Sequence, residues 1–268
     1  MSYRLLNFFN KFRLFRSNQH RFLKNKSINT ALFGLTQTIP RCLEEGNTPV
    51  GVFLDLSKAF DSVILDILLH KLFSNGVQDN VLDWFRSYLS GRRQIVKINQ
   101  GGESYRSSEL PIERGVPQGS SLGTIFFVVY FNDFADLFDS MEQTVVQYAD
   151  DSSIILNVKD DYSTARAMNS CLPVIENWLR ANGLFLNISK TQSIVFSTNR
   201  SRKVFPESVL MINENIKFND SVRCLGIILD KHLTWREHIQ QVSSRLSYVI
   251  FNFRIIKNLI NVNSMISL

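Results

Sequence analysis

The sequence predicts an α/β or α+β fold with a mixed β-sheet, and three observations lead to this prediction. The chain has 268 residues, 44% hydrophobic and 20% charged, which is enough for one large domain or two small ones with a real core. Short β-prone runs alternate irregularly with helical patterns. Hairpin signals lie between some of these runs, so part of the sheet is expected to be antiparallel.

Each element is predicted from its hydrophobic period and from the residues at its ends. Helices are expected at 3–16, 27–45 (interrupted or ended at Pro40), from Asp61 or Ser62 as cap to Phe73, then at 79–89, 121–138, 162–181 (disturbed near Pro173) and 235–257. Strands are expected at 50–56, 94–98, 104–108, 144–149, 152–157, 193–197, 209–212 and 223–229. Gly76, Gly91 and Gly183 are expected to end helices.

The positive charge is concentrated at the start of the chain. The formal net charge is +6, yet residues 1–26 contain seven Lys or Arg and no acid, so residues 27–268 carry a net charge of −1. A basic segment of this kind favours phosphate or anionic lipid as a partner. A solvated helix face is the alternative interpretation.

Cysteines and apolar runs exclude several classes of protein. Cys42, Cys171 and Cys224 are far apart, which fits a reducing compartment and neither a disulfide framework nor a metal spacing. The longest fully apolar run, 125–131, has seven residues, far below the ~20 that a membrane span requires. We therefore expect no signal peptide, no transmembrane segment and no membrane partner, and a nuclear or cytoplasmic location.

Carboxylates occupy two unusual places. Asp55 lies in the apolar run 50–56, where a charge is costly unless it is paired or bound to a cation. Asp150 and Asp151 are adjacent at the tip of a predicted hairpin, although such a pair is also ordinary turn chemistry. If the strand with Asp55 lies beside this hairpin, the three carboxylates converge at one end of the sheet. Hard oxygen ligands of this kind suit Mg²⁺, and two such ions about 4 Å apart serve phosphoryl displacement.

A glycine-rich loop, 115–119, precedes the apolar helix predicted from Ser121. Its sequence, GVPQG, is expected to expose backbone N–H groups beside the positive end of the helix dipole, where a base or a phosphate can approach. An ordinary connecting loop is the alternative.

Six segments, taken in order, resemble the reverse transcriptase domain of non-LTR retrotransposons, most closely the jockey-like mobile elements of insects. They are NQHRFLKNKS (18–27), FLDLSKAFDSV (53–63), RGVPQGSSLGTIFF (114–127), QYADDSSI (147–154), GLFLNISKT (183–191) and CLGIILDKHLTWREHI (224–239). The resemblance covers nearly the whole chain and implies RNA-directed DNA polymerase activity, with an RNA template, a DNA primer or target and dNTPs as partners.

The family's fold implies a right-hand polymerase with a mixed, mainly antiparallel palm sheet backed by helices. By this resemblance residues 1–48 are partial fingers and 49–91 are palm. Residues 92–114 are then a fingers hairpin, 115–233 are palm, and 234–268 start a thumb. Together they would form one reverse transcriptase domain.

The resemblance also implies site residues. Asp55 and Asp150 would bind two Mg²⁺ ions, with Mn²⁺ as a substitute, and Asp151 would complete the catalytic site. The carbonyl group of Leu56 would be a further metal ligand. Phe60 matches the aromatic residue that excludes a ribose 2′-hydroxyl in related enzymes.

Other matched positions imply contacts with substrates. Gln118 and Gly119 would line the nucleotide and template site, and Lys190 would lie near the triphosphate. Leu225 and Gly226 would belong to the hairpin that grips the primer end. Lys24 and Lys26 would contact the triphosphate or the template.

Departures from the family pattern leave a second hypothesis open. Arg21 replaces a usual glycine and is expected to crowd a turn, Leu23 replaces a frequent arginine, and Ser121 and Thr124 differ from the usual residues. The endonuclease and most of the thumb are expected to lie outside this chain, as in a domain truncated at both ends. The alternative function is therefore a catalytically inactive nucleic-acid-binding remnant of a decayed element. RNA-templated RNA synthesis is a third interpretation, which Phe60 disfavours.

Overall fold

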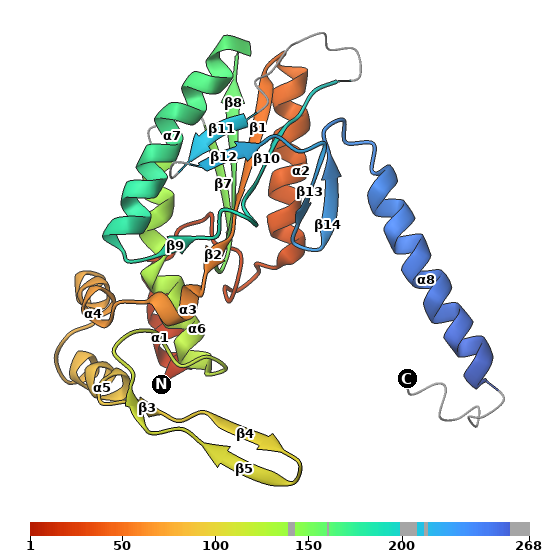
Figure 1. Ribbon diagram of the computed structural model, residues 1–268. Coiled ribbons are helices and arrows are strands. Elements are labelled where there is room, and N and C mark those ends of the chain that lie inside the picture. Colours follow the sequence, from red (N-terminus) through yellow and green to blue (C-terminus); the bar gives the residue numbers. More distant parts are fainter. Residues whose placement is uncertain (139–142, 160, 199–207, 212–213, 258–268) are drawn as a thin grey trace.

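A four-stranded antiparallel sheet forms the centre of the molecule (Figure 1). The structure is a computed structural model that describes residues 1–138, 143–159, 161–198, 208–211 and 214–257. The sheet has the order β10-β1-β8-β7, with β1 (Thr48–Leu54), β7 (Gln143–Tyr148), β8 (Asp151–Val158) and β10 (Gln192–Val195). Each pairing in it is antiparallel, which confirms the predicted class of helices with a mainly antiparallel sheet.

Strand β1 is buried on both faces because a helix covers each side of the sheet (Figure 1). Helix α2 (Ile28–Glu44) packs on one face, where its Leu35 and Ile39 share a cluster with Phe53. Helix α7 (Asp161–Ala181) covers the other face, on the side of Val50 and Val52. This two-sided burial explains why the strand is apolar at both alternating positions.

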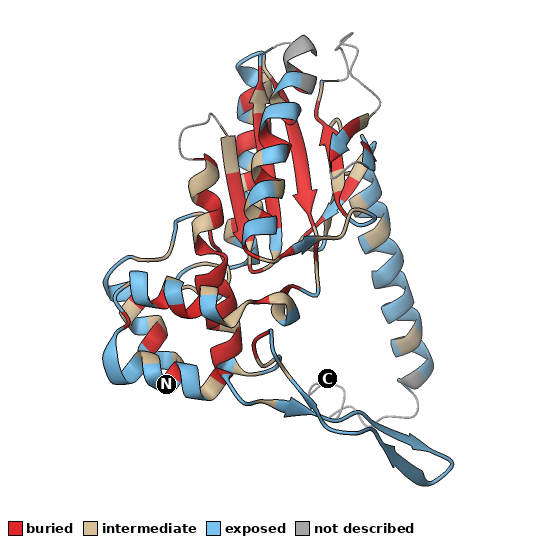
Figure 2. Cartoon of the chain, turned by 60° about the vertical axis from the view of Figure 1, so that its left-hand side comes forward, coloured by how far each residue is buried: buried red, intermediate tan, exposed pale blue. Residues whose placement is uncertain are grey.

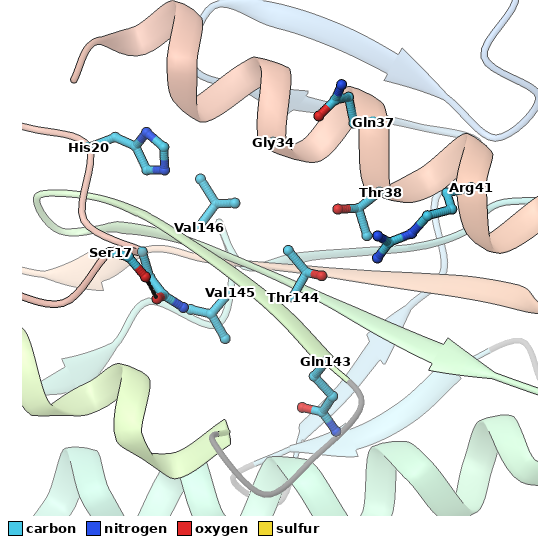
Figure 3. Close-up of a pocket in the computed structure, with 11 residues that line it drawn as sticks. Ser17, His20, Gly34, Gln37, Thr38, Arg41, Gln143, Thr144, Val145 and Val146 are labelled. Atoms are coloured by element: carbon cyan, nitrogen blue, oxygen red, sulfur yellow. Dashed lines mark hydrogen bonds between the residues drawn. The ribbon is translucent and has the colours of Figure 1, made fainter. Parts of the chain in front are cut away.

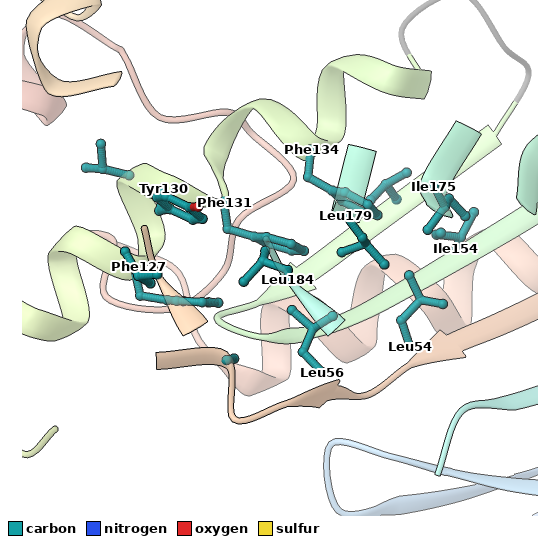
Figure 4. Packing of buried hydrophobic residues seen from close by; sticks show 14 of the residues in the cluster. Leu54, Leu56, Phe127, Tyr130, Phe131, Phe134, Ile154, Ile175, Leu179 and Leu184 are labelled. Atoms are coloured by element: carbon teal, nitrogen blue, oxygen red, sulfur yellow. The ribbon is translucent and has the colours of Figure 1, made fainter. Parts of the chain in front are cut away.

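Aromatic side chains fill the core below the sheet (Figure 4). Phe127 and Tyr130 of helix α6 (Ser121–Tyr130), Phe131 at its C-terminal cap and Phe134 of the 3-10 helix Asn132–Phe138 all have 0% exposure. Full burial of a side chain of this size stabilises a fold by roughly 1.5–3 kcal/mol. The stretch 121–138 has the length and composition of a membrane span, but most of it lies inside this core.

The remaining elements are short strands and helices around this centre. They are α1 (Ser2–Lys11), β2 (Leu56–Ser57), α3 (Ala59–Ser62), α4 (Leu65–Ser74), α5 (Asp79–Leu89), β3 (Arg93–Gln94), β4 (Lys97–Gln100), β5 (Glu103–Arg106), β6 (Leu110–Pro111), β9 (Phe185–Leu186), β11 (Ser208–Met211), β12 (Glu214–Lys217), β13 (Ser221–Cys224), β14 (Ile227–Asp230) and α8 (Arg236–Ile256). The β4–β5 hairpin and helix α8 project from the body, and both are largely exposed (Figure 2).

Several boundaries differ from the sequence prediction. Asp61 and Ser62 do not cap the helix that ends near Gly76, because Val63 and Ile64 adopt extended backbone and divide α3 from α4. The carbonyl group of Val63 accepts a hydrogen bond from Gly115 N–H (2.7 Å), a tertiary contact that propensity cannot foresee. Pro40 neither interrupts nor ends α2.

The predicted strand 223–229 is instead the turn-connected pair β13 and β14. Leu225 and Gly226 both have positive φ, 46° and 90°, and form the turn between these strands. The long apolar helix predicted at 121–138 also changes after Tyr130 into the 3-10 helix. Part of the predicted strand 209–212 lies outside the described residues, which include Val209 to Met211 as most of β11.

Candidate active site

Aspartates from two segments of the chain lie at the same end of the sheet. Strand β1 pairs with β8 in a register that places Leu54 opposite Ser152. The next residue beyond Leu54 is Asp55, and the residue before Ser152 is Asp151. Both aspartates line one small cavity of about 90 Å³. The predicted juxtaposition is therefore present for Asp55 and Asp151, whereas Asp150 is not among the residues that line this cavity.

Asp55 lies in a one-residue break between β1 and β2, rather than inside a strand. Its carbonyl oxygen accepts a hydrogen bond from Asn187 N–H (2.8 Å), and its N–H points to the hydroxyl group of Thr191 (3.5 Å). The backbone of Asp55 is thus bound by the segment that contains Lys190. This segment also pairs with β2, where Leu56 lies opposite Leu186.

Asp150 lies in the turn between β7 and β8, and hydrogen bonds to the Gln19 side chain hold this turn in place. The residue before Asp150, Ala149, has a left-handed φ of 59°. The side-chain oxygen of Gln19 accepts hydrogen bonds from the N–H groups of Ala149 (3.1 Å), His20 (3.0 Å) and Arg21 (2.9 Å). Gln19 is only 1% exposed. Sequence reasoning missed this residue, because an amide within a basic segment gives no signal of such a contact.

The carboxylates repel one another. The pKa of Asp151 is raised, first by burial and then by the negative charges of Asp150 and Asp55. The guanidinium group of Arg21 opposes this shift, and it lies over the rings of Phe22 (4.7 Å) and Tyr148 (5.2 Å). The expectation that Arg21 crowds a turn is wrong, because the left-handed residue there is Phe22, with φ of 61°.

The chemistry of these side chains fits a divalent cation. A cation beside Asp55, Asp150 and Asp151 would relieve their mutual repulsion, and carboxylate oxygens are the ligands that Mg²⁺ prefers. The backbone carbonyl group of Leu56 is the further ligand that the family resemblance implies. Among the residues that the structure describes, no group of three His, Cys, Asp or Glu side chains is already arranged to hold a metal ion.

A larger cavity, about 710 Å³, contains three of the expected nucleotide-site residues. Phe60, Gln118 and Gly119 line it together with Arg21 and Phe22. Phe60 stacks on Phe127 of helix α6, with ring centroids 4.7 Å apart. Three residues that the family resemblance assigns to one site thus line the same cavity, whereas Arg21 and Phe22 were not expected there.

The loop before α6 is fastened to α3. Val116 N–H donates to the carbonyl group of Phe60 (2.9 Å), and Gln118 Nε2 donates to Asp61 Oδ1 (3.0 Å). A Cβ atom on Gly115 would lie 2.8 Å from Asp61 Cα, so only glycine permits this approach. Phe60 and Gln118 consequently belong to one connected unit.

The remaining expected residues lie in different surroundings. Lys190 and Leu225 line the small cavity with Asp55 and Asp151, whereas Gly226 occupies the β13–β14 turn. Lys26 donates to the carbonyl group of Ser17 (2.9 Å) and Lys24 is exposed. Within the described part of the chain, neither lysine lines the two cavities that contain the aspartates and Phe60.

A third cavity, about 600 Å³, lies between α2 and β7 (Figure 3). His20, Thr38 and Arg41 line it with the polar start of β7. The pKa of His20 is lowered to about 4 by burial and by the charge of Lys26, so its ring is neutral at physiological pH. His20 Nδ1 lies 2.8 Å from the hydroxyl oxygen of Thr30, which holds the ring against α2.

The chain is similar in sequence to several known proteins and in fold to several solved structures. The sequence is 28% identical over 78% of the chain to the "RNA-directed DNA polymerase from mobile element jockey" of Drosophila melanogaster, of which it covers 23%. It is 26% identical over 73% of the chain to the "Probable RNA-directed DNA polymerase from transposon X-element" of the same organism, covering 21% of that protein. The chain thus spans about a quarter or less of the curated relatives it matches.

Solved structures with the same fold include telomerases of Candida tropicalis. The apo enzyme aligns with a TM-score of 0.56 at 15% identity, over 87% of this chain and 39% of that one. A form truncated from its C-terminal domain gives a TM-score of 0.55 at 17% identity, over 87% of this chain and 43% of that one. The sequence model described as "Reverse transcriptase (RNA-dependent DNA polymerase)" matches residues 1–229, and the chain therefore belongs to the reverse transcriptase family.

Proposed function

We propose that this chain is the catalytic core of an RNA-directed DNA polymerase of a non-LTR retrotransposon. The observation that carries the proposal is the register of β1 and β8, which brings Asp55 beside Asp151 in the cavity that Lys190 also lines. The reaction is attack of a primer 3′-hydroxyl on the α-phosphate of a dNTP, with release of pyrophosphate, on an RNA template.

The side chains of this site have distinct tasks in the proposed reaction. Asp55, Asp150 and Asp151 hold the divalent cations, and Gln19 keeps the Asp150 turn in its left-handed conformation. The chemistry that bound Mg²⁺ or Mn²⁺ supplies at such carboxylates is stabilisation of the charge on the attacking and leaving oxygens. Lys190 places a positive charge near the triphosphate, which lowers the cost of the charge that develops there.

The larger cavity is the proposed site of the incoming nucleotide. Phe60 excludes a 2′-hydroxyl on the sugar, while Gln118 and Gly119 contact the nucleotide and the template. Leu225 and Gly226 hold the primer end. Lys24 and Lys26 contact the template or the triphosphate, Lys26 after leaving its Ser17 contact.

The domains follow the same proposal. Residues 1–48 and 92–114 are fingers, 49–91 and 115–233 are palm, and 234–268 begin the thumb. A protein with this function works on an RNA template and a DNA primer in the nucleus or the cytoplasm.

Primer extension tests the proposal. The purified chain is given a DNA primer on an RNA template, dNTPs and Mg²⁺, and product length is measured. Asp150→Asn is expected to abolish extension while retaining the fold, because the amide replaces a charged ligand with a neutral one. Asp83→Asn, an exposed position on α5, is the matched control and should extend the primer normally.

Two results would contradict the proposal. One is the absence of extension by the unchanged chain, and the other is equal extension by the unchanged and Asp150→Asn chains. Retention of RNA binding without extension would favour the alternative, an inactive nucleic-acid-binding remnant.

A further inference from the structure

The outer edge of β7 is open along part of its length. β7 is the last strand in the order β10-β1-β8-β7, so the sheet itself pairs only one of its edges. On the outer edge, Gln147 N–H donates to the carbonyl group of Asn18 (2.8 Å), and the Gln147 carbonyl group accepts from His20 N–H (2.8 Å). Backbone groups of alternate residues point to the same edge of a strand, so the N–H and carbonyl groups of Val145 also point outward. Among the residues that the structure describes, none hydrogen-bonds to these two groups.

The opposite edge of the sheet, on β10, is covered. The carbonyl group of Ser193 accepts a hydrogen bond from Asn219 N–H (2.8 Å), and Ser193 forms an isolated bridge with Phe218. Proteins commonly protect an open edge with a charged residue or a proline, because exposed backbone groups pair readily with another chain. The sequence of β7, QTVVQY, contains neither. The outer edge of β7 therefore has the character of a strand that receives a further strand.

The cavity of about 600 Å³ between α2 and β7 lies along this open edge (Figure 3). Residues 143–146 of β7 line it, a length of about 13 Å at roughly 3.3 Å per residue. Its other wall is one face of α2, on which Gly34, Thr38 and Arg41 recur at helical spacing. A Cβ atom on Gly34 would lie 3.6 Å from Val146 Cγ2, so a larger residue there would narrow the cavity. A groove between a helix and an open strand edge has the shape that receives an extended peptide.

The charges at the two ends of this groove are positive. Within the described part of the chain, Arg41 is the one charged residue that lines it, and its side chain is 67% exposed with Glu45 at 3.9 Å. Lys26 donates to the carbonyl group of Ser17 (2.9 Å), which lies at the opposite end of the cavity from Arg41 (Figure 3). Acidic side chains on an added strand would therefore meet a cation at either end.

We infer that this groove binds an extended acidic peptide of a partner protein, which adds to the central sheet as a further strand beside β7. Backbone donors and acceptors recur along the open edge at the spacing of a strand, which a peptide backbone matches and a nucleic acid does not. The residues that line the groove are different from those that line the cavities with Asp55 and with Phe60. The inference is therefore independent of the proposed function.

Fluorescence anisotropy of a labelled acidic peptide, TVEVTVE, tests the inference on the full 268-residue chain. Most of the affinity comes from the peptide backbone, so the same peptide with methylated backbone amides should bind at least about tenfold more weakly. In NMR spectra of the chain, hydrogen exchange at the Val145 amide should become slower when TVEVTVE is bound, because this N–H group gains an acceptor. Absence of TVEVTVE binding, or equal binding of the methylated peptide, would overturn the inference.

Reversal of the charge at Arg41 tests which peptide the groove prefers. Arg41→Glu should lower the affinity for TVEVTVE about fivefold and raise the affinity for the basic peptide TVKVTVK. Arg86→Glu, at an exposed position on α5, is the charge-matched control and should change neither affinity. Equal affinities in the Arg41→Glu and Arg86→Glu chains would contradict the acidic preference. Displacement of the labelled peptide by single-stranded oligouridylate as readily as by unlabelled TVEVTVE would assign the groove to nucleic acid and overturn the inference.

Discussion

The side-chain oxygen of Gln19 accepts a hydrogen bond from the backbone N–H of Ala149, 130 positions further along the chain. Ala149 is the left-handed residue that directs the chain into Asp150. The N-terminal segment is therefore part of the support of the aspartate turn. Its isolated bridge from Gln19 to Gln147 adds a second attachment to the same strand.

Gln19→Met should weaken catalysis more than binding. Methionine fills the space but accepts no hydrogen bond from the three backbone N–H groups. Each buried N–H group left without an acceptor costs about 1–3 kcal/mol. The rate of primer extension is expected to fall by at least about tenfold, since the turn that carries Asp150 loses its hydrogen bond to Gln19. Gln37→Met, at an exposed position on α2, is the control. Unchanged extension by Gln19→Met would contradict this role.

Phe60→Val should relax discrimination against ribonucleotides. The stack on Phe127 fixes the ring of Phe60 at the mouth of the proposed nucleotide pocket, and valine removes that ring. The ratio of NTP to dNTP use is expected to rise about 10–200-fold, which corresponds to the 1–3 kcal/mol of a lost steric contact. Single-nucleotide extension with each substrate measures the ratio. Phe33→Val, at a ring that is 61% exposed, should leave it unchanged.

Gly115→Ala should destabilise the fold. The new Cβ atom would lie 2.8 Å from Asp61 Cα, and the backbone φ of 84° is itself unfavourable for alanine. We expect a loss of about 2–4 kcal/mol in the free energy of unfolding, measured by urea denaturation. Gly46→Ala provides the comparison, because φ is 79° there and no atom lies within 4 Å of the added Cβ. Equal losses in the two variants would show that the close approach to Asp61 carries no cost.

Lys71→Met should cost far more than removal of a surface ion pair. Lys71 Nζ donates to the carbonyl oxygen of Tyr130 and to Asp133 Oδ1, each at 2.7 Å, and its side chain is only 14% exposed. Leaving these acceptors without their donor is expected to cost about 2–3 kcal/mol. The exposed pair Lys231–Asp220 has the same distance, so Lys231→Met should cost less than about 1 kcal/mol. Urea denaturation of both variants checks the difference.

His20 should make stability depend on pH in mildly acidic solution. Its pKa is about 4 in the folded chain and 6.5 as an ordinary value, so between these pH values the unfolded chain binds a proton that the folded chain does not. The stability that the neutral His20 ring contributes is therefore fully present above pH 6.5 and decreases by about 3 kcal/mol as the pH falls to 4. Thermal unfolding of the unchanged chain and of His20→Gln should show a difference that varies in this window. A difference in stability between the two chains that does not vary with pH would contradict the lowered pKa of His20.

The sequence predicted the central part of the site because its signals are local. An aspartate at the end of an apolar run and a pair of aspartates between β-prone segments are visible without a structure, and the antiparallel register then brings them together. The loop from Gly115 to Gln118, which precedes α6, could be recognised from the sequence for the same reason. The hairpin of β4 and β5 followed from the Gly101–Gly102 turn.

The features of the fold and of the site that the sequence did not predict depend on contacts between distant segments. The Gln19 contact to Ala149 joins segments 130 positions apart, and the division of α3 from α4 depends on a hydrogen bond to Gly115. Arg21 was misread as an obstacle because its partners, the Phe22 and Tyr148 rings and the Asp151 charge, are set only by tertiary structure. The hydrogen bond from the Lys26 ammonium group to the carbonyl oxygen of Ser17 likewise has no signal in the sequence.

The strand order of the central sheet sets the sequence in which the site can form during synthesis. β1 lies between β8 and β10, and both of these neighbours leave the ribosome about a hundred residues or more after β1 does. Until β8 emerges, the apolar β1 has both edges unpaired, a state in which strands are prone to associate with other chains. A translation product that stops before β8 would therefore carry Asp55 on a strand without its sheet, exposed to aggregation and proteolysis.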